Sequence, residues 1–427
     1  MIVAAIFLAL IVMICFNVPI AVALAISAIL GLLYIEGTGS LVTVALDMYD
    51  GSTKFSLIAI PMFVLAGAIM NAGGISKRLI AFVSALLGFI RGALAMINIA
   101  VSLFFAEISG SAVADVAALG SVMIPAMRRK GYPRAFAAAV TSSSATLAVI
   151  IPPSIPMILY GVMSDSSIVQ LFVAGVIPGI LGGLGMMVVS YWMARRHGWP
   201  VEDVFQLARL RTTFIEALPA LVLPVIILGG IFGGIVTATE GAGVAVVAAL
   251  IVGGLIYREL NWRFLYEAAI EGGVQTAVVM LLVAASALIG VYLTELQVPQ
   301  KLAAAILNWT DNRYVVLALL NVFFLAIGLF LHSAAAIILV VPVVMPLVNA
   351  VGIDPVHFGL IVTLNLGIGQ QTPPVASVLI TACAVAKANV WEVSKVNVNF
   401  VAVLFAILVL VTYVPAIPMS LVEFFYR

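Results

Sequence analysis

The chain has 427 residues, of which 64% are hydrophobic and only 9% are charged, with a formal net charge of +1. This composition lies outside the usual range of soluble domains and predicts an integral membrane protein. The balanced charge gives no indication of a nucleic-acid partner. The lack of Ser/His/Asp, HExxH, GxGxxG and P-loop patterns argues against ATP-driven and conventional catalytic functions.

Long apolar runs predict most of the helices, because about 20 helical residues cross the hydrocarbon of a bilayer. The first run has no basic start and leads into a second, so we expect no cleavable signal and take residue 1 as part of the mature fold. The predicted continuous spans are 1–16, 18–35, 54–71, 133–164, 168–194, 214–235, 240–257, 274–293, 356–385 and 397–420.

Two further apolar segments, 93–130 and 315–350, are interrupted near their middles by "EISGSAVAD" and "LHSAAA". Each predicts a re-entrant hairpin, which enters and leaves on one side of the membrane. With the N-terminus outside, fifteen of the nineteen basic residues fall on the inner side, as the positive-inside rule requires. The first hairpin then opens inward and the second outward. The basic residues left outside are Lys54, Lys301, Arg313 and Arg427.

Opposite hairpin orientations suggest an inverted repeat. An offset of 221 residues places Pro125 on Pro346 and the pair Pro152–Pro153 on Pro373–Pro374, without a gap. Chance similarity between apolar segments is the alternative. The predicted all-α fold has a first repeat, 1–211, with arm helix 72–92, hairpin 93–130 and broken helix 133–164, and a second, 212–427, with arm helix 294–314, hairpin 315–350 and broken helix 356–385.

The proline pairs predict helices that break at membrane depth, where only protein or an aqueous site can satisfy the freed backbone groups. Free carbonyls and hydroxyls are hard oxygen ligands that suit Na⁺, and each hairpin tip would reach the depth of one break. Close helix packing by small residues is the alternative role. The predicted sodium-binding residues are Ser109, Gly110, Ser111, Ile150 and Pro152, and in the second repeat His332, Ser333, Gly369, Gln371, Thr372 and Pro373.

Three residues near these tips and breaks are candidates for substrate binding: Ser154, Asp115 and Glu240. Carboxylates inside a membrane are usually functional or paired, so Asp115 could assist the first ion site or the substrate cavity. Glu240 could equally stabilise a helix N-terminus after Thr237 and Thr239. His332 has a similar alternative, as a structural hydrogen-bonding residue at the second tip.

Four motifs of the chain are "SGSAVADVAALGSVMIPAM", "GYPRAFAAAVTSSSATLAVIIPPSIPMILYG", "TATEGAGVAV" and "GQQTPPV". They resemble the large membrane subunit of tripartite ATP-independent periplasmic (TRAP) transporters, the DctM or SiaM type. The resemblance covers essentially the whole chain. Two departures are His332, where relatives often have an acidic residue, and "TATEG" in place of the more usual "TPTEA". Both leave the roles of His332 and Glu240 open.

The resemblance implies an elevator-type fold of the ion transporter superfamily in the bacterial inner membrane, where the charge count above predicts a periplasmic N-terminus. It implies a small four-helix membrane subunit and a soluble periplasmic binding protein as partners, two or more Na⁺ ions and no organic cofactor. The implied function is sodium-coupled uptake of an organic acid anion, such as sialic acid or a C4-dicarboxylate. A stand-alone sodium- or proton-coupled carboxylate carrier and an intramembrane enzyme are the alternatives.

Overall fold

The computed structural model describes residues 6, 8–10, 12–13, 16, 18–199, 201 and 203–426, without the side chains of residues 36, 107–109 and 271. Most of the predicted first span, 1–16, therefore lies outside the described residues, as does the side chain of Ser109. The predicted periplasmic position of the N-terminus stays a prediction for the same reason.

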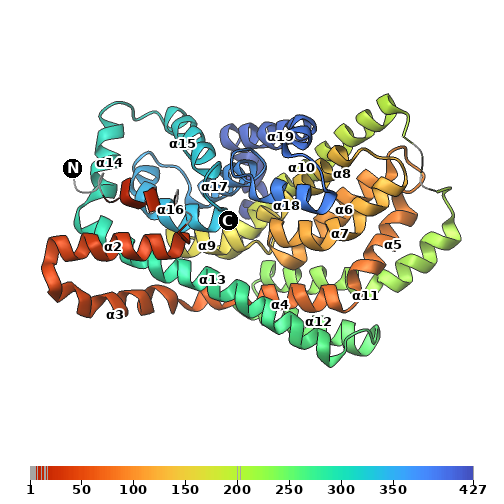
Figure 1. Cartoon of the computed structure of the whole chain (residues 1–427), viewed down its shortest axis with the longest axis horizontal. Helices are drawn as coiled ribbons and strands as arrows, with labels where there is room; N and C mark the ends of the chain where they lie inside the picture. The colour runs from red at the N-terminus through yellow and green to blue at the C-terminus, as the bar shows by residue number, and fades with distance from the viewer. Residues whose placement is uncertain are drawn as a thin grey trace.

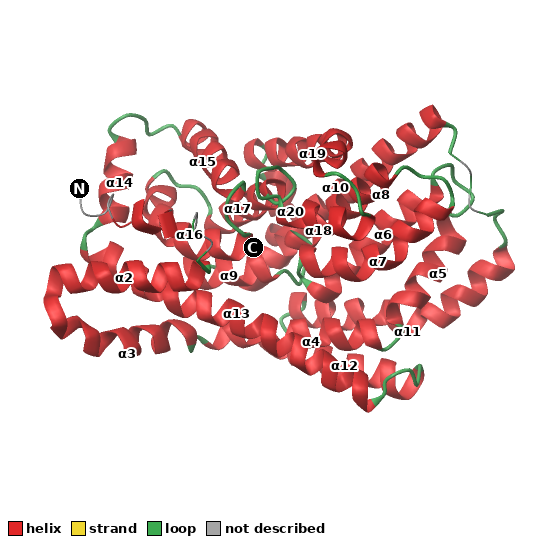
Figure 2. Cartoon of the chain, viewed as in Figure 1, coloured by secondary structure: helices red, strands yellow, loops and turns green. Residues whose placement is uncertain are grey.

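The described chain is helical from α2 to α20, and no strand occurs among these residues (Figures 1 and 2). The first half contains α2 (Ile20–Glu36), α3 (Leu41–Ser52), α4 (Ala59–Ala72), α5 (Ile75–Leu87), α6 (Ala93–Ser109), α7 (Ala112–Arg129), α8 (Arg134–Ala145), α9 (Ile155–Ser164) and α10 (Ile168–His197). The second half contains α11 (Leu207–Phe232), α12 (Ala238–Leu250), α13 (Trp262–Glu295), α14 (Val298–Leu307), α15 (Arg313–Gly328), α16 (Ser333–Ala350), α17 (Pro355–Gly369), α18 (Ser377–Ala386), α19 (Val390–Tyr413) and α20 (Ala416–Tyr426). Short 3₁₀ segments lie at η1 (Gly37–Ser40), η2 (Phe55–Ile58) and η3 (Thr146–Val149), and a π-helical segment, η4 (Ile251–Ile256), extends α12.

Within the part of the chain that the structure describes, seven helices are long and apolar enough to cross a membrane, which supports the predicted multi-pass membrane protein. Five of them coincide with predicted continuous spans, a sixth is the second arm of the second predicted hairpin, and the seventh is α19. They are Phe55–Ala72, Ile168–His197, Leu207–Phe232, Ala238–Ile256, Trp262–Glu295, Ser333–Ala350 and Val390–Tyr413.

Helix boundaries recur at the offset that the sequence predicts. Adding 221 to the bounds of α7 gives 333–350, the bounds of α16, and adding 221 to the start of α8 gives Pro355, where α17 begins. Both proline pairs, at 152–153 and 373–374, contain a cis peptide bond. The inverted orientation of the two repeats and their boundary at 211–212 stay predictions; in the structure this boundary falls inside α11.

The hairpins and broken helices of the two halves are interleaved. The helix after the first break, α9, packs against α16 of the second hairpin, while α18 packs against α7 and α8 of the first half. The long helix α13 runs along α2, α3 and α4, and α12 packs on α4 (Figure 1). One body therefore holds both hairpins and both breaks, and a second group of helices lies along it.

Two parts of the chain differ from the sequence-based expectation. Residues 41–52 form α3, although this stretch is too short and too polar to be predicted as a span. The predicted span 397–420 is wrong in its bounds, because α19 ends at Tyr413 and a separate helix, α20, follows Pro415. Proline lacks the amide that would continue the helix and disfavours helical backbone at the residue before it.

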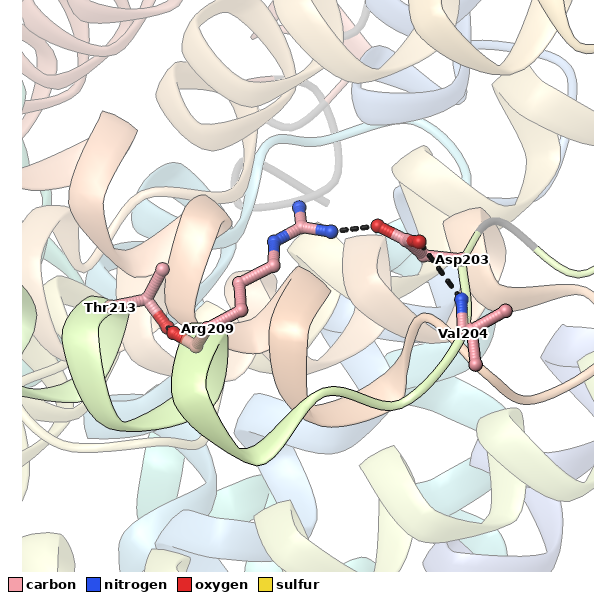
Figure 3. A network of polar contacts seen from close by, with 4 residues as sticks. All are labelled: Asp203, Val204, Arg209 and Thr213. Carbon is pink, nitrogen blue, oxygen red and sulfur yellow. Dashed lines mark hydrogen bonds and ion pairs between the residues drawn. The ribbon is translucent and has the colours of Figure 1, made fainter.

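The loop between α10 and α11 is tied to its surroundings by polar contacts. Arg209, in the first turns of α11, pairs with the carboxylate of Asp203, which also accepts a hydrogen bond from the amide of Val204 (2.9 Å; Figure 3). The amide of Asp203 donates to the carbonyl of Gly88, just after α5 (3.0 Å). An exposed ion pair contributes about 0–1 kcal/mol, so these contacts orient the loop more than they stabilise the fold.

Candidate functional site

The tip of the first hairpin lies directly on the first break. The carbonyl of Gly110, the residue between α6 and α7, accepts a hydrogen bond from the amide of Ile155 (3.4 Å). Gly110 has a φ of 58°, and a Cβ there would lie 2.8 Å from the carbonyl oxygen of Pro153. Left-handed backbone and this close approach both require glycine. We call this contact between residues 109–111 and 150–155 the first junction.

Backbone groups at the first break are satisfied largely by local partners. The hydroxyl of Ser154 donates to the carbonyl of Val149 (2.6 Å) and accepts from the amide of Met157 (3.4 Å), which caps α9. Ser154 and Pro152 are buried, and the carbonyl of Ile150 lies against Gly175 of α10. Ser154 therefore satisfies backbone groups on both sides of the first break.

The tip of the second hairpin contacts the second break in the same way. The carbonyl of Leu329 accepts a hydrogen bond from the amide of Val375 (3.3 Å). The backbones of Gly328 and Gly369 touch, since a Cβ on Gly369 would lie 2.6 Å from the carbonyl oxygen of Gly328. We call this contact between residues 328–333 and 369–376 the second junction.

Polar side chains of the second junction bind to backbone groups nearby. The imidazole Nδ1 of His332 accepts from the amide of Ala334 (3.4 Å) at the start of α16, and the hydroxyl of Thr372 donates to the carbonyl of Ile368 (3.0 Å). Ser333 is buried and Pro373 half-buried, whereas Pro374 and Val375 are exposed. The second junction is therefore more open than the first, whose break is buried throughout.

A buried amide network joins the second break to the first. The side-chain amide of Gln371 donates to the carbonyl of Ser142 (2.8 Å) and contacts the hydroxyl of Thr146 in η3. Asn397 of α19 donates to the side-chain oxygen of Gln371 (3.1 Å) and accepts from the hydroxyl of Ser143 (2.6 Å). Because each buried partner depends on the others, this network fixes the position of one break relative to the other.

Sequence reasoning identified Gln371 but missed its partners Ser142, Ser143, Thr146 and Asn397. The only signal was the presence of polar residues within apolar stretches, in "VTSSSAT" and "VNVNF". That signal does not say which polar residues meet, because Gln371 and Ser142 are 229 positions apart.

Asp115 lies in a cavity rather than in the amide network. It is 1% exposed, in the first turn of α7, and lines a cavity of about 400 Å³ between α4, α7 and α13. Asn71, Glu267 and Gln275 line the same cavity. Asp115 therefore faces the helices that lie along the hairpin body.

Glu240 has the structural role that the sequence left open. Its carboxylate accepts from the amide and the hydroxyl of Thr237 (2.8 and 2.9 Å), and the Thr237 hydroxyl accepts from the amide of Glu240 (3.2 Å). This reciprocal arrangement is a capping box at the start of α12. Ser154, Asp115 and Glu240 thus lie in three different surroundings: a break, a cavity and an exposed helix start.

Both junctions contain oxygens of carbonyls and hydroxyls, and the second also contains the imidazole of His332 and the side-chain amide of Gln371. Among the described residues, no group of three or more His, Cys, Asp or Glu side chains could hold a metal ion. Hard cations prefer oxygen ligands of this kind, so the sodium sites that the sequence predicts stay predictions at these junctions.

Comparison with known proteins gives consistent matches along the chain. The family described as "Tripartite ATP-independent periplasmic transporter, DctM component" matches residues 7–417. The isethionate TRAP transporter permease protein DctMQ of Oleidesulfovibrio alaskensis is 41% identical over 409 residues, which cover 94% of this chain and 64% of that protein's length. The sialic acid TRAP transporter large permease protein SiaM of Vibrio cholerae is 37% identical over 409 residues, 96% of each chain.

A solved structure shows the same fold. The YdaH transporter of Alcanivorax borkumensis, described as having an unusual topology, superposes with a TM-score of 0.65 over 91% of each chain, at 15% sequence identity. At this identity the likeness concerns the fold alone, and it supports the predicted fold class of a helical membrane transporter.

The contact between Gly328 and Gly369 predicts a test of the second junction. Gly369→Ala places a methyl group against backbone atoms that cannot move aside, so we expect a loss of about 1–3 kcal/mol and a lower Tm. Gly273→Ala is the matched control, because a Cβ at Gly273 in α13 meets nothing within 4 Å. Equal melting temperatures for the two variants in a thermal-unfolding assay would contradict the close approach.

The capping box predicts that Glu240 acts on stability rather than on transport. Glu240→Ala and Thr237→Ala should each lower the stability of the chain, because each removes half of the reciprocal cap, and loss of the Thr237 N-cap should cost about 0.5–2 kcal/mol. Uptake per folded molecule should stay at the wild-type level. A variant of Glu240 that unfolds like the wild type but no longer transports would show that the carboxylate contacts substrate.

Proposed function

The chain belongs to the DctM family of tripartite ATP-independent periplasmic transporters, and from that premise we propose that it carries out sodium-coupled uptake of an organic acid anion across the bacterial inner membrane. The family membership confirms the resemblance found in the sequence motifs and makes the chain a transporter subunit rather than an enzyme. The observation that carries the proposal is the pair of junctions, where each hairpin tip lies against one break.

Sodium is proposed to bind at these junctions. The first site would use Ser109–Ser111 with Ile150–Pro152, and the second would use His332–Ser333 with Gly369–Pro373. A break in a membrane helix frees carbonyls that lipid cannot satisfy, and Na⁺ is a hard cation that such oxygens accommodate. The close backbone contacts at Gly110 and Gly369 support this fit, since they bring tip and break oxygens within a short distance.

An elevator movement is proposed to carry the two sites across the membrane. It is supported by the packing of α9 on α16 and of α18 on α7, which joins hairpins and breaks into one body. The Gln371–Asn397 network strengthens that body from within. Helices α2–α4 and α11–α13 would form the stationary part.

The partners are proposed from the family. They are a small four-helix membrane subunit and a soluble periplasmic binding protein that delivers the substrate. Relatives are named for isethionate, sialic acid and C4-dicarboxylates, which share an acidic group on a small organic body. We propose that the substrate is an organic acid anion of this kind. The chain itself would be surrounded by membrane lipid and would use no organic cofactor.

The coupling predicts a dependence on both sodium and membrane potential. One charge moved through 100 mV is worth ~2.3 kcal/mol, so two Na⁺ carried with one monoanion would drive inward movement electrically as well as chemically. In proteoliposomes holding the chain with its small subunit and binding protein, uptake should require external Na⁺ and rise with a negative interior.

Uptake that is unaffected by removal of Na⁺ and by collapse of the potential would contradict sodium coupling. Equal uptake by the purified chain alone would instead indicate a stand-alone carrier. The second outcome is not expected, because nothing in the described chain resembles a soluble substrate-binding domain.

Two hydroxyl variants test the proposed ion sites. Ser111→Ala and Thr372→Val should each raise the Na⁺ concentration for half-maximal uptake about tenfold, because each removes an oxygen ligand worth about 1.5 kcal/mol or more. Ser121→Ala in α7 and Thr381→Val in α18 are matched controls, since they remove the same hydroxyl groups outside both junctions, where these hydroxyls donate to the carbonyls of Ala118 and Ser377. An unchanged sodium dependence in both test variants would contradict both proposed ion sites.

A further inference from the structure

A second cavity, of about 240 Å³, lies among α13, α14, α16 and the turn that follows α3. Its walls are mainly apolar, with the hydroxyl-bearing residues Ser286 and Thr294 on α13. Lys54 is the single charged residue among the described residues that line it. Both hydroxyls donate to carbonyls of α13, so the Lys54 ammonium is the group in this wall that suits an anion. An apolar cavity with one charged side chain is typical of small-molecule sites.

The smaller cavity corresponds by position to the cavity that holds Asp115. Adding 221 to Lys54 gives Gln275, which lines the larger cavity, and the lining stretches of α4 and α7 map in the same way onto α13 and α16. The charges, however, are opposite. Asp115 and Glu267 line the larger cavity, where Glu267 pairs with Arg263 (2.9 Å), whereas Lys54 is the single charged residue among the described residues that line the smaller one. An anion is therefore favoured in the cavity of Lys54.

Lys54 also bridges the two groups of helices. It lies between α3 and η2, and its ammonium donates to the carbonyl of Val162, near the end of α9 (3.2 Å). An ammonium has three donors, so this bond leaves two for another acceptor. Since α9 follows the first break, an anion held by Lys54 would lie against the body that holds both junctions.

We propose that Lys54 binds the acidic group of the transported substrate, and that this substrate is a small organic acid with a carboxylate or sulfonate group rather than a nine-carbon sugar acid. The cavity volume of about 240 Å³ lies below the ~300–1,000 Å³ usual for larger ligands, which sets the size limit. Lys54 is also one of the few basic residues predicted on the outer side, where the substrate arrives. This inference rests on the proposed function only in taking the substrate to be an organic anion.

The experiment measures equilibrium binding, which needs no gradient and no partner. The purified full chain in lipid nanodiscs with NaCl is titrated with radiolabelled isethionate, succinate and sialic acid. We expect at least one of the two small acids to bind the wild type and sialic acid to bind more weakly. Lys54→Gln, which introduces the residue found at the corresponding position 275, should weaken binding of the small acid about 10- to 100-fold, because a hydrogen bond to a charged group is lost.

Two further variants separate recognition from folding. Lys54→Arg keeps the charge and should retain most of the binding. Lys301→Gln is the matched control, because Lys301 is predicted on the same side and its ammonium also donates to a carbonyl, that of Leu296 (2.8 Å), but it does not line the cavity. This variant should bind as the wild type does.

Three results would overturn the inference: wild-type affinity in Lys54→Gln, tighter binding of sialic acid than of both small acids, or binding of neither small acid to the wild type. Failure of the proposed function would look different. Uptake that does not need Na⁺, together with binding that requires Lys54, would contradict the proposal of sodium coupling and leave the role of Lys54 intact. Sodium-driven uptake that is unchanged in Lys54→Gln would remove the role of Lys54 alone.

Discussion

Backbone groups that are exposed inside a membrane must find partners in the protein, because lipid offers none. This chain interrupts two helices with proline pairs, and the rest of the structure is arranged around the groups that those breaks release. The carbonyls of Gly110 and Leu329 each accept an amide from the break that faces them. Ser154 and Thr372 satisfy further carbonyls from within the breaks. The hairpins therefore complete the broken helices as well as lying beside them.

The same requirement couples the two breaks to each other. Gln371 follows the second helix interruption, yet its side chain binds the end of α8 and η3, just before the first. Asn397 closes the network from α19. A shift at one junction would leave buried amide groups of the other without partners, and each such group costs about 1–3 kcal/mol. The two proposed ion sites are thus parts of one mechanical unit, which is what joint transport of two cations with an anion requires.

Charge is distributed unevenly around this unit. Asp115 and Glu267 line the larger cavity, while Lys54 is the charged residue of the smaller cavity, which lies at the corresponding place in the other half. Glu240, by contrast, is used in capping a helix. The corresponding cavities of the two halves therefore differ in charge. One suits a cation and the other an anion, although similar helices line both.

The sequence by itself determined the membrane class, the all-helical fold and both helix breaks, because hydropathy and proline pairs are properties that a linear chain displays directly. Four motifs indicated the family by resemblance. The re-entrant and inverted arrangement of the two hairpins stays a prediction. The sequence also named Gln371 and Thr372 as residues of the second break. It did not reveal α3 or the end of α19 at Tyr413. For Glu240 it left two alternatives open, substrate binding and a helix cap. Only the tertiary structure decided which polar groups meet, such as the Lys54 ammonium with the Val162 carbonyl, 108 positions away, because packing sets the contacts between distant segments and local composition does not.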